Sequence, residues 1–170
     1  MAAVSHFEYL SRAPHMLSRH VAEVYDTYVA NLQTSASTVD VNGLRTCSMA
    51  ITIVAVGVVG TFEGMLQSRF GWNDAYRELD KVLRDKGHVD LADRLLDYRL
   101  AVNVLKHGEG RSYDRLLARR ASLPFAIKGN GEAFFNEGDI SEVGGLVDTR
   151  GPFIDHCVGI IDEISGVIGL

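Results

Sequence analysis

Four side chains able to take part in acid–base or phosphate chemistry lie near one another in the middle of the chain. They are Arg99, Asn103, Lys106 and His107, and Gly108 follows them directly. On a helix with about 100° between successive residues, all four fall within roughly 100° of one another. We call them the basic–amide group and expect them on the last turns of a helix that stops at Gly108.

The same helix is predicted to carry a second polar strip. Asp90, Asp93 and Asp97 fall at roughly 120–180° from Arg99 on the helical wheel. These acidic residues are expected to face water. Because an amphipathic helix needs only one wet face, the basic–amide group is predicted to face a partner, a groove or a reacting molecule.

The residue types of the basic–amide group suit cleavage of a phosphodiester without a metal ion. Histidine transfers protons near neutral pH. Arginine forms paired hydrogen bonds to phosphate, lysine adds a point charge, and asparagine can orient an imidazole or a ribose hydroxyl. The predicted reaction is attack of a ribose 2′-OH on the adjacent phosphate. No carboxylate cluster for two metal ions stands beside these residues in the sequence, so no metal and no cofactor is expected.

A structural role is the alternative for the same residues. Cations near the end of a helix stabilise its dipole, and the last histidine can cap free carbonyl groups. Asn103 fits this alternative less well, because an amide at a buried edge needs hydrogen-bond partners.

The pattern Arg-x-x-x-Asn-x-x-Lys-His-Gly at the end of a helix resembles the signature of HEPN domains. The apolar helix ending at residues 59–66, with Glu63 inside it, also resembles the second helix of that family. The resemblance extends from roughly residue 21 to the last helix. It implies an all-α bundle, and many HEPN proteins are metal-independent endoribonucleases of toxin–antitoxin or antiviral systems. They act as homodimers in which the motif helices of both chains form one cleft.

Carried over to this chain, the resemblance makes Arg99 the phosphate-binding arginine and His107 the catalytic histidine, with Asn103 beside them. Lys106 and Arg111 are the predicted substrate-binding residues. The seven residues between Arg99 and His107 exceed the separation usual in the family. A non-catalytic HEPN-like interaction or dimerisation module is therefore the alternative function, and a phosphate-ligand-binding domain is a third. The implied partners are a second copy of the chain, RNA, and an antitoxin or nucleotidyltransferase.

Apolar residues recur every three to four positions, which predicts one all-α domain over residues 1–170 with five to six helices. The expected helices cover about 14–34, 44–70, 73–86, 90–107, 112–121 and 152–168, with Asn73 and Ser112 as N-caps. Residues 123–147 contain repeated glycines and predict a long irregular loop, with a short hairpin at Asn130-Gly131.

The stretch Thr46–Phe62 has no charged residue and barely reaches the length of a membrane span. We expect a buried central helix instead, with a strip of small residues at Gly57, Gly60 and Gly64 that lets another helix approach closely. The same spacing inside a membrane would favour dimerisation.

The bulk composition predicts an ordinary folded domain without a membrane partner. The chain has 170 residues and a net charge of −5, so any contact with nucleic acid must be local. Cys47 and Cys157 lie far apart, which argues against a zinc finger or a disulfide framework. Met1–Leu10 has no secretory pattern, and a cytoplasmic location is expected.

Overall fold

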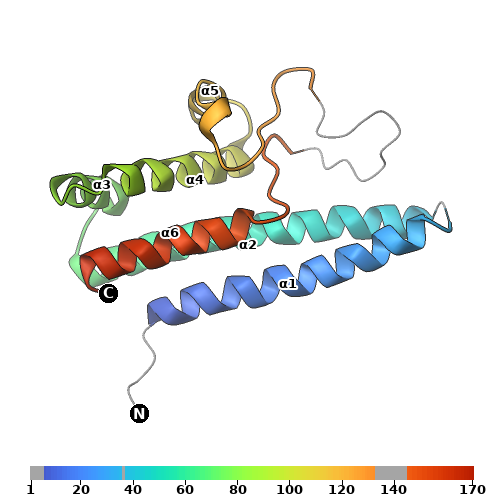
Figure 1. The fold of residues 1–170 in the computed structure, drawn as a ribbon, viewed down its shortest axis with the longest axis horizontal. Coiled ribbons are helices and arrows are strands. Elements are labelled where there is room, and N and C mark those ends of the chain that lie inside the picture. The colour runs from blue at the N-terminus through green and yellow to red at the C-terminus, as the bar shows by residue number, and fades with distance from the viewer. Residues whose placement is uncertain (1–5, 36, 133–144) are drawn as a thin grey trace, which may run out of the picture.

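The computed structural model describes residues 6–35, 37–132 and 145–170. Its helices are α1 (His6–Leu32), α2 (Thr38–Phe70), α3 (Ala75–Asp85), α4 (Val89–His107), α5 (Arg111–Leu117), the 3-10 turn η1 (Arg120–Ser122) and α6 (Phe153–Ile168). Two long helices, α1 and α2, run side by side, α6 lies along α2, and α3, α4 and α5 form the other layer (Figure 1). The predicted all-α bundle is confirmed: strand pairing in the described ranges is limited to one isolated bridge.

Helix α2 contacts α1, α3, α4 and α6. Its first turn is capped by Ser37, whose hydroxyl accepts a hydrogen bond from Val39 N at 3.2 Å. The helix ends where Gly71 takes a left-handed conformation with φ 71°. Its buried residues recur at helical spacing and include Leu44, Cys47, Ile51, Ala55, Val58, Phe62 and Leu66.

Helix α2 contacts four helices as expected of a central helix, but the prediction that it is buried is wrong for one side. Met49 is 58% exposed and Ile53 is 65% exposed, because only α1 borders this side and no described helix covers it. By length and composition alone α2 could cross a membrane, and 33% of its most apolar window is buried inside the structure.

Helix α1 begins at His6, eight residues before the predicted start at Pro14. Pro14 lies inside the helix, where it removes one backbone donor. The turns before it are held by tertiary packing, since the Phe7 ring meets the Phe62 ring edge-on with centroids 6.1 Å apart. Leu10 also packs against the core.

The C-terminal half of α1 lies unusually close to α2 at Gly43. A Cβ atom at this position would lie 2.4–2.6 Å from three carbons of the Tyr28 ring. Glycine therefore allows the ring to rest directly on the α2 backbone. Nearby, Asn31 Nδ2 donates to Asp40 Oδ1 at 3.0 Å and closes this end of the helix pair.

Sequence chemistry sets the other helix ends, with two corrections. Asp74 and not Asn73 caps α3, accepting from Arg77 N at 3.2 Å. Gly110 and not Ser112 precedes α5, with no side-chain cap. Gly108 ends α4 as predicted. The φ angles of Gly108 and Gly110, 73° and 148°, lie in the range that favours glycine, and the chain reverses between these two residues.

The segment after α5 is anchored at both of its described ends. The rings of Tyr98, Phe125 and Phe153 pack together with centroids 5.0–5.2 Å apart. Ile127 and Val147 form an antiparallel bridge. Residues 129–132 make a turn through Glu132 N and Gly129 O at 3.1 Å. The return strand of the predicted hairpin falls in 133–144, outside the described residues.

The close approach at Gly43 predicts a stability difference between two glycine variants. Gly43→Ala and Gly159→Ala gain the same helix propensity, but the added methyl group meets Tyr28 in the first and no atom within 4 Å in the second. We expect Gly43→Ala to be less stable than Gly159→Ala by about 1–3 kcal/mol, measured by urea unfolding. Equal unfolding free energies would contradict the close packing.

Candidate functional site

The basic–amide group lies on α4 as predicted, but its members stand in two different environments. Arg99 and Asn103 are half-buried, whereas Lys106 and His107 are exposed. Arg99 and His107 are separated by about 12 Å along the helix axis, from eight steps of 1.5 Å. Within one chain the structure therefore does not bring the arginine and the histidine to one reaction centre.

Arg99 joins α4 to α3. Its guanidinium carbon lies 4.0 Å from the centroid of the Tyr76 ring, a distance typical of a cation–π interaction. The Tyr76 hydroxyl donates to the Val59 carbonyl of α2 at 2.6 Å. Burial lowers the pKa of Arg99, and the charges of Tyr76 and Glu63 oppose that shift. Acidic neighbours and a stacked aromatic ring favour a structural role over phosphate binding.

The end of α4 is open to solution. Lys106, His107 and Arg111 are exposed and Asn103 is half-buried. None of the four side chains forms a hydrogen bond or ion pair of 4 Å or less with another residue in the described ranges, so each is available to a partner from outside.

The predicted acidic strip is wrong at Asp97. Asp90 and Asp93 do reach solvent, paired with Arg94 at 2.9 Å and Arg84 at 2.6 Å. Asp97 is only 5% exposed, because the turn after α4 folds α5 back over it. Its Oδ2 accepts from Arg119 Nη2 at 3.1 Å, while its Oδ1 has no hydrogen-bond partner in the described structure.

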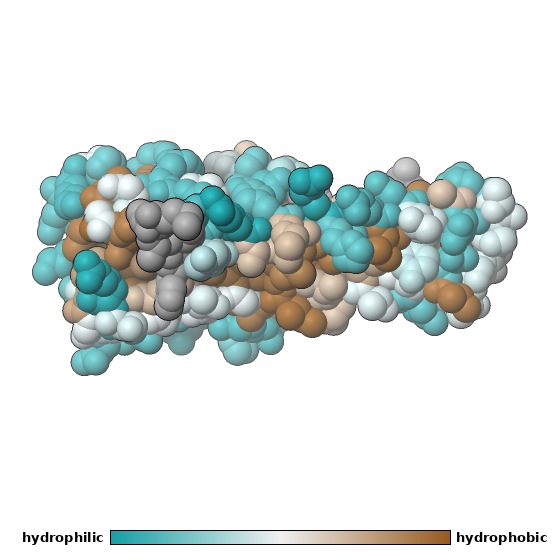
Figure 2. Space-filling view, turned by 90° about the horizontal axis from the view of Figure 1, so that it is seen from below, coloured by the Kyte–Doolittle hydropathy of each residue, from teal (hydrophilic) through white to brown (hydrophobic). Residues whose placement is uncertain are grey.

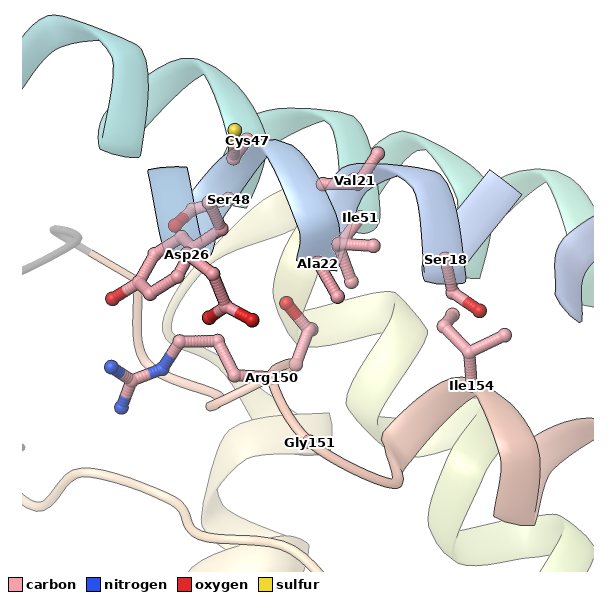
Figure 3. A pocket seen from close by; sticks show the side chains of 12 residues that line it. Ser18, Val21, Ala22, Asp26, Cys47, Ser48, Ile51, Arg150, Gly151 and Ile154 are labelled. Atoms are coloured by element: carbon pink, nitrogen blue, oxygen red, sulfur yellow. The ribbon is translucent and has the colours of Figure 1, made fainter. Parts of the chain in front are cut away.

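A cavity of about 270 Å³ lies between α1, α2 and the start of α6 (Figure 3). We call it the inner cavity. It is lined by Ser18, Val21, Ala22, Tyr25, Asp26, Cys47, Ser48, Ile51, Thr149, Arg150, Gly151 and Ile154. No member of the basic–amide group lines it. Local sequence patterns could not predict it, since residues 149–154 join walls from α1 and α2 that lie more than 90 residues earlier in the chain.

A wider apolar hollow of about 570 Å³ separates α1 from α2 on the exposed side of α2. We call it the α1–α2 groove. Its walls are Tyr9, Leu10, Ala13, Pro14 and Leu17 of α1 with Ile53, Val54, Gly57, Val58, Thr61 and Met65 of α2. Seen from the α1 side, hydrophobic surface is exposed along this face (Figure 2).

No protein-family model, curated protein or solved structure matches this chain. The residues and surfaces described above are therefore the basis for a functional proposal.

The buried carboxyl of Asp97 predicts a specific pH dependence. Burial raises its pKa above the ordinary value, against the opposing charge of Arg119. A raised folded-state pKa contributes stability that is present at acid pH and is lost as pH rises through that pKa. Relative to Asp97→Asn, the wild type should therefore gain unfolding free energy from pH 7 to pH 4. Urea unfolding at both values measures this; a relative loss at pH 4 would contradict it.

Proposed function

We propose that the protein is a non-catalytic helical interaction module that binds a second copy of itself through the α1–α2 groove. The observation that carries the proposal is the exposed apolar surface on both walls of this groove. Tyr9, Leu17 and Ile53 are 55%, 45% and 65% exposed. A monomer rarely leaves a continuous apolar face of this kind in water.

The face is large enough for a dimer. Met49, which is 58% exposed one turn before Ile53, extends the exposed apolar face of α2 beyond the groove itself. From Met49 to Met65, α2 rises about 24 Å, and each of the two helices is about 10 Å wide. The face then covers roughly 500 Å² on each copy, or about 1,000 Å² in total, which reaches the lower end of specific interfaces.

The face is also self-complementary along α2. Ile53 projects from the helix, and one turn later Gly57 has no side chain and no atom within 4 Å of where a Cβ would stand. In a two-fold pairing, Ile53 of one copy can rest over Gly57 of the other, and the second contact follows by symmetry.

A lipid bilayer fits the same face less well. The opposite side of α2 holds Ala55, Phe62 and Leu66 in the core, and each of them is 0% exposed. Crossing a membrane would remove these side chains from their contacts with the other helices. Arg12 and Arg19 are exposed on α1, the helix that forms one wall of the groove, and burying such charges in hydrocarbon is costly.

Self-association is tested with a charge placed in the groove. Ile53→Asp should weaken the dimer at least about tenfold, because an unpaired carboxylate would be buried in the interface. Val39→Asp is the matched control: Val39 is exposed on the same helix and does not line the groove. Sedimentation equilibrium measures both. A wild type that stays monomeric at its highest soluble concentration contradicts the proposal.

RNA cleavage is the second candidate function, favoured by the open end of α4. The HEPN resemblance assigns catalysis to His107, and Lys106 and Arg111 stand exposed nearby. Since Arg99 is engaged with Tyr76, phosphate binding in this candidate falls to Lys106 and Arg111. An antitoxin or nucleotidyltransferase partner belongs to this candidate alone.

The two candidates separate in a cleavage assay with single-stranded RNA and a chelator. If the second candidate holds, the wild type cuts and His107→Ala loses at least about 100-fold in rate, as expected for removal of a general acid or base. His156→Ala, which changes an exposed histidine on α6, should retain the rate. Undiminished cutting by His107→Ala rules out the assignment of His107, and a dimer that does not cut supports the interaction module.

A further inference from the structure

The inner cavity combines an apolar floor with a polar rim. We call its apolar lining residues Val21, Ala22, Ile51 and Ile154 the floor, and its polar lining residues, which carry hydroxyl groups and two charges, the rim. At about 270 Å³ it lies just below the usual size of small-molecule pockets. Its size and lining suit a small organic molecule with one polar end.

The hydroxyl groups of the cavity differ in whether they are already used. Ser18 Oγ donates to His15 O and Ser48 Oγ donates to Leu44 O, each at 3.1 Å, within their own helices. Thr149 is only 6% exposed, yet its hydroxyl makes no hydrogen bond with any residue of the described ranges. Its oxygen is not one of the fully enclosed polar atoms of the described structure, and the residue lines the cavity, so the hydroxyl can bond to a molecule there.

The two charges on the rim are not equivalent. Arg150 donates to both carboxylate oxygens of Asp148, at 2.8 and 2.7 Å, and also hydrogen-bonds Tyr25. Its positive charge is therefore balanced. Asp26 forms no ion pair with a residue of the described ranges, and its side chain extends into the space between α1 and the segment before α6 (Figure 3). The rim thus presents a carboxylate without a counter-charge.

We propose that the inner cavity binds a small amphipathic cation. Its ammonium group donates to the Asp26 carboxylate and the Thr149 hydroxyl. Its apolar body lies against Val21, Ile51 and Ile154. A carboxylate ligand is disfavoured, because Asp26 would repel it while Arg150 is already engaged by Asp148.

Cys47 provides an internal reporter of occupancy. It lines the cavity and is only 6% exposed, and burial raises the pKa of its thiol. The other cysteine, Cys157, is buried outside the cavity lining. A bound cation should slow alkylation of Cys47 by iodoacetamide relative to that of Cys157, whereas general stabilisation would slow both.

The probe is 2-phenylethylamine, compared with 2-phenylethanol and 3-phenylpropionate, which keep the ring and change the polar end. At ten times its Kd, the amine should raise Tm by about 3–5 °C. The alcohol and the acid should bind at least about tenfold more weakly, since a hydrogen bond to a charged group is worth more than a neutral one.

Variants identify the site. Asp26→Asn should weaken amine binding at least about tenfold. Thr149→Val should weaken it by only a few-fold. Asp162→Asn, which removes an exposed aspartate of α6 outside the cavity, should bind the amine like the wild type. Because Asp26 is exposed, its variant should fold, and Thr149→Ser should restore binding if Thr149→Val is unstable. Equal binding of the three probes, equal affinity in Asp26→Asn, or no protection of Cys47 would each overturn the proposal.

Discussion

Burial of one side of α2 is the constraint on which the remaining structure depends. Its apolar positions recur at helical spacing, and four other helices cover them. The Tyr76 hydroxyl adds a directional contact, because it donates to the Val59 carbonyl inside the α2 ladder at 2.6 Å. This bond fixes α3 against α2, and Arg99 then holds α4 against the same tyrosine ring. The Tyr76 side chain therefore links α2, α3 and α4, in addition to the direct packing of α4 on α2.

Several polar residues of α4 are engaged in contacts between α4 and the neighbouring helices. On one side, Arg99 lies on an aromatic ring; on another, Asp97 is covered by α5 and accepts from Arg119. Residue types that suit chemistry in isolation therefore serve here to connect helices. Asp90 and Asp93 reach solvent but are ion-paired, whereas the last turn, with Lys106 and His107, is open to solution without such a pair. The exposed apolar surface lies instead on α1 and α2, where no third helix of the described ranges covers their shared groove.

The helices and most of their ends could be predicted from the sequence, because local spacing and capping determine them. Gly71, Gly87 and Gly108 end helices through positive φ angles, which only glycine adopts readily. The start of α1 could not be predicted, since Phe7 is held by Phe62 from another helix and local rules stop at Pro14. The burial of Asp97 and the existence of the inner cavity also could not be predicted from local sequence patterns. Both arise where segments distant in the sequence meet, and a helical wheel contains no information about its neighbours.

The bridge between Ile127 and Val147 limits the free-energy cost of a change in loop length. These two residues lie far apart in the sequence but side by side in the structure, and Lys128 N donates to Leu146 O at 2.9 Å. The separation of the two ends is therefore fixed by the body and not by the length of the segment between them. Doubling that length costs only about 0.6 kcal/mol in loop entropy. A change in the number of residues between Ile127 and Val147 should therefore cost little free energy as long as this bridge keeps the two ends together.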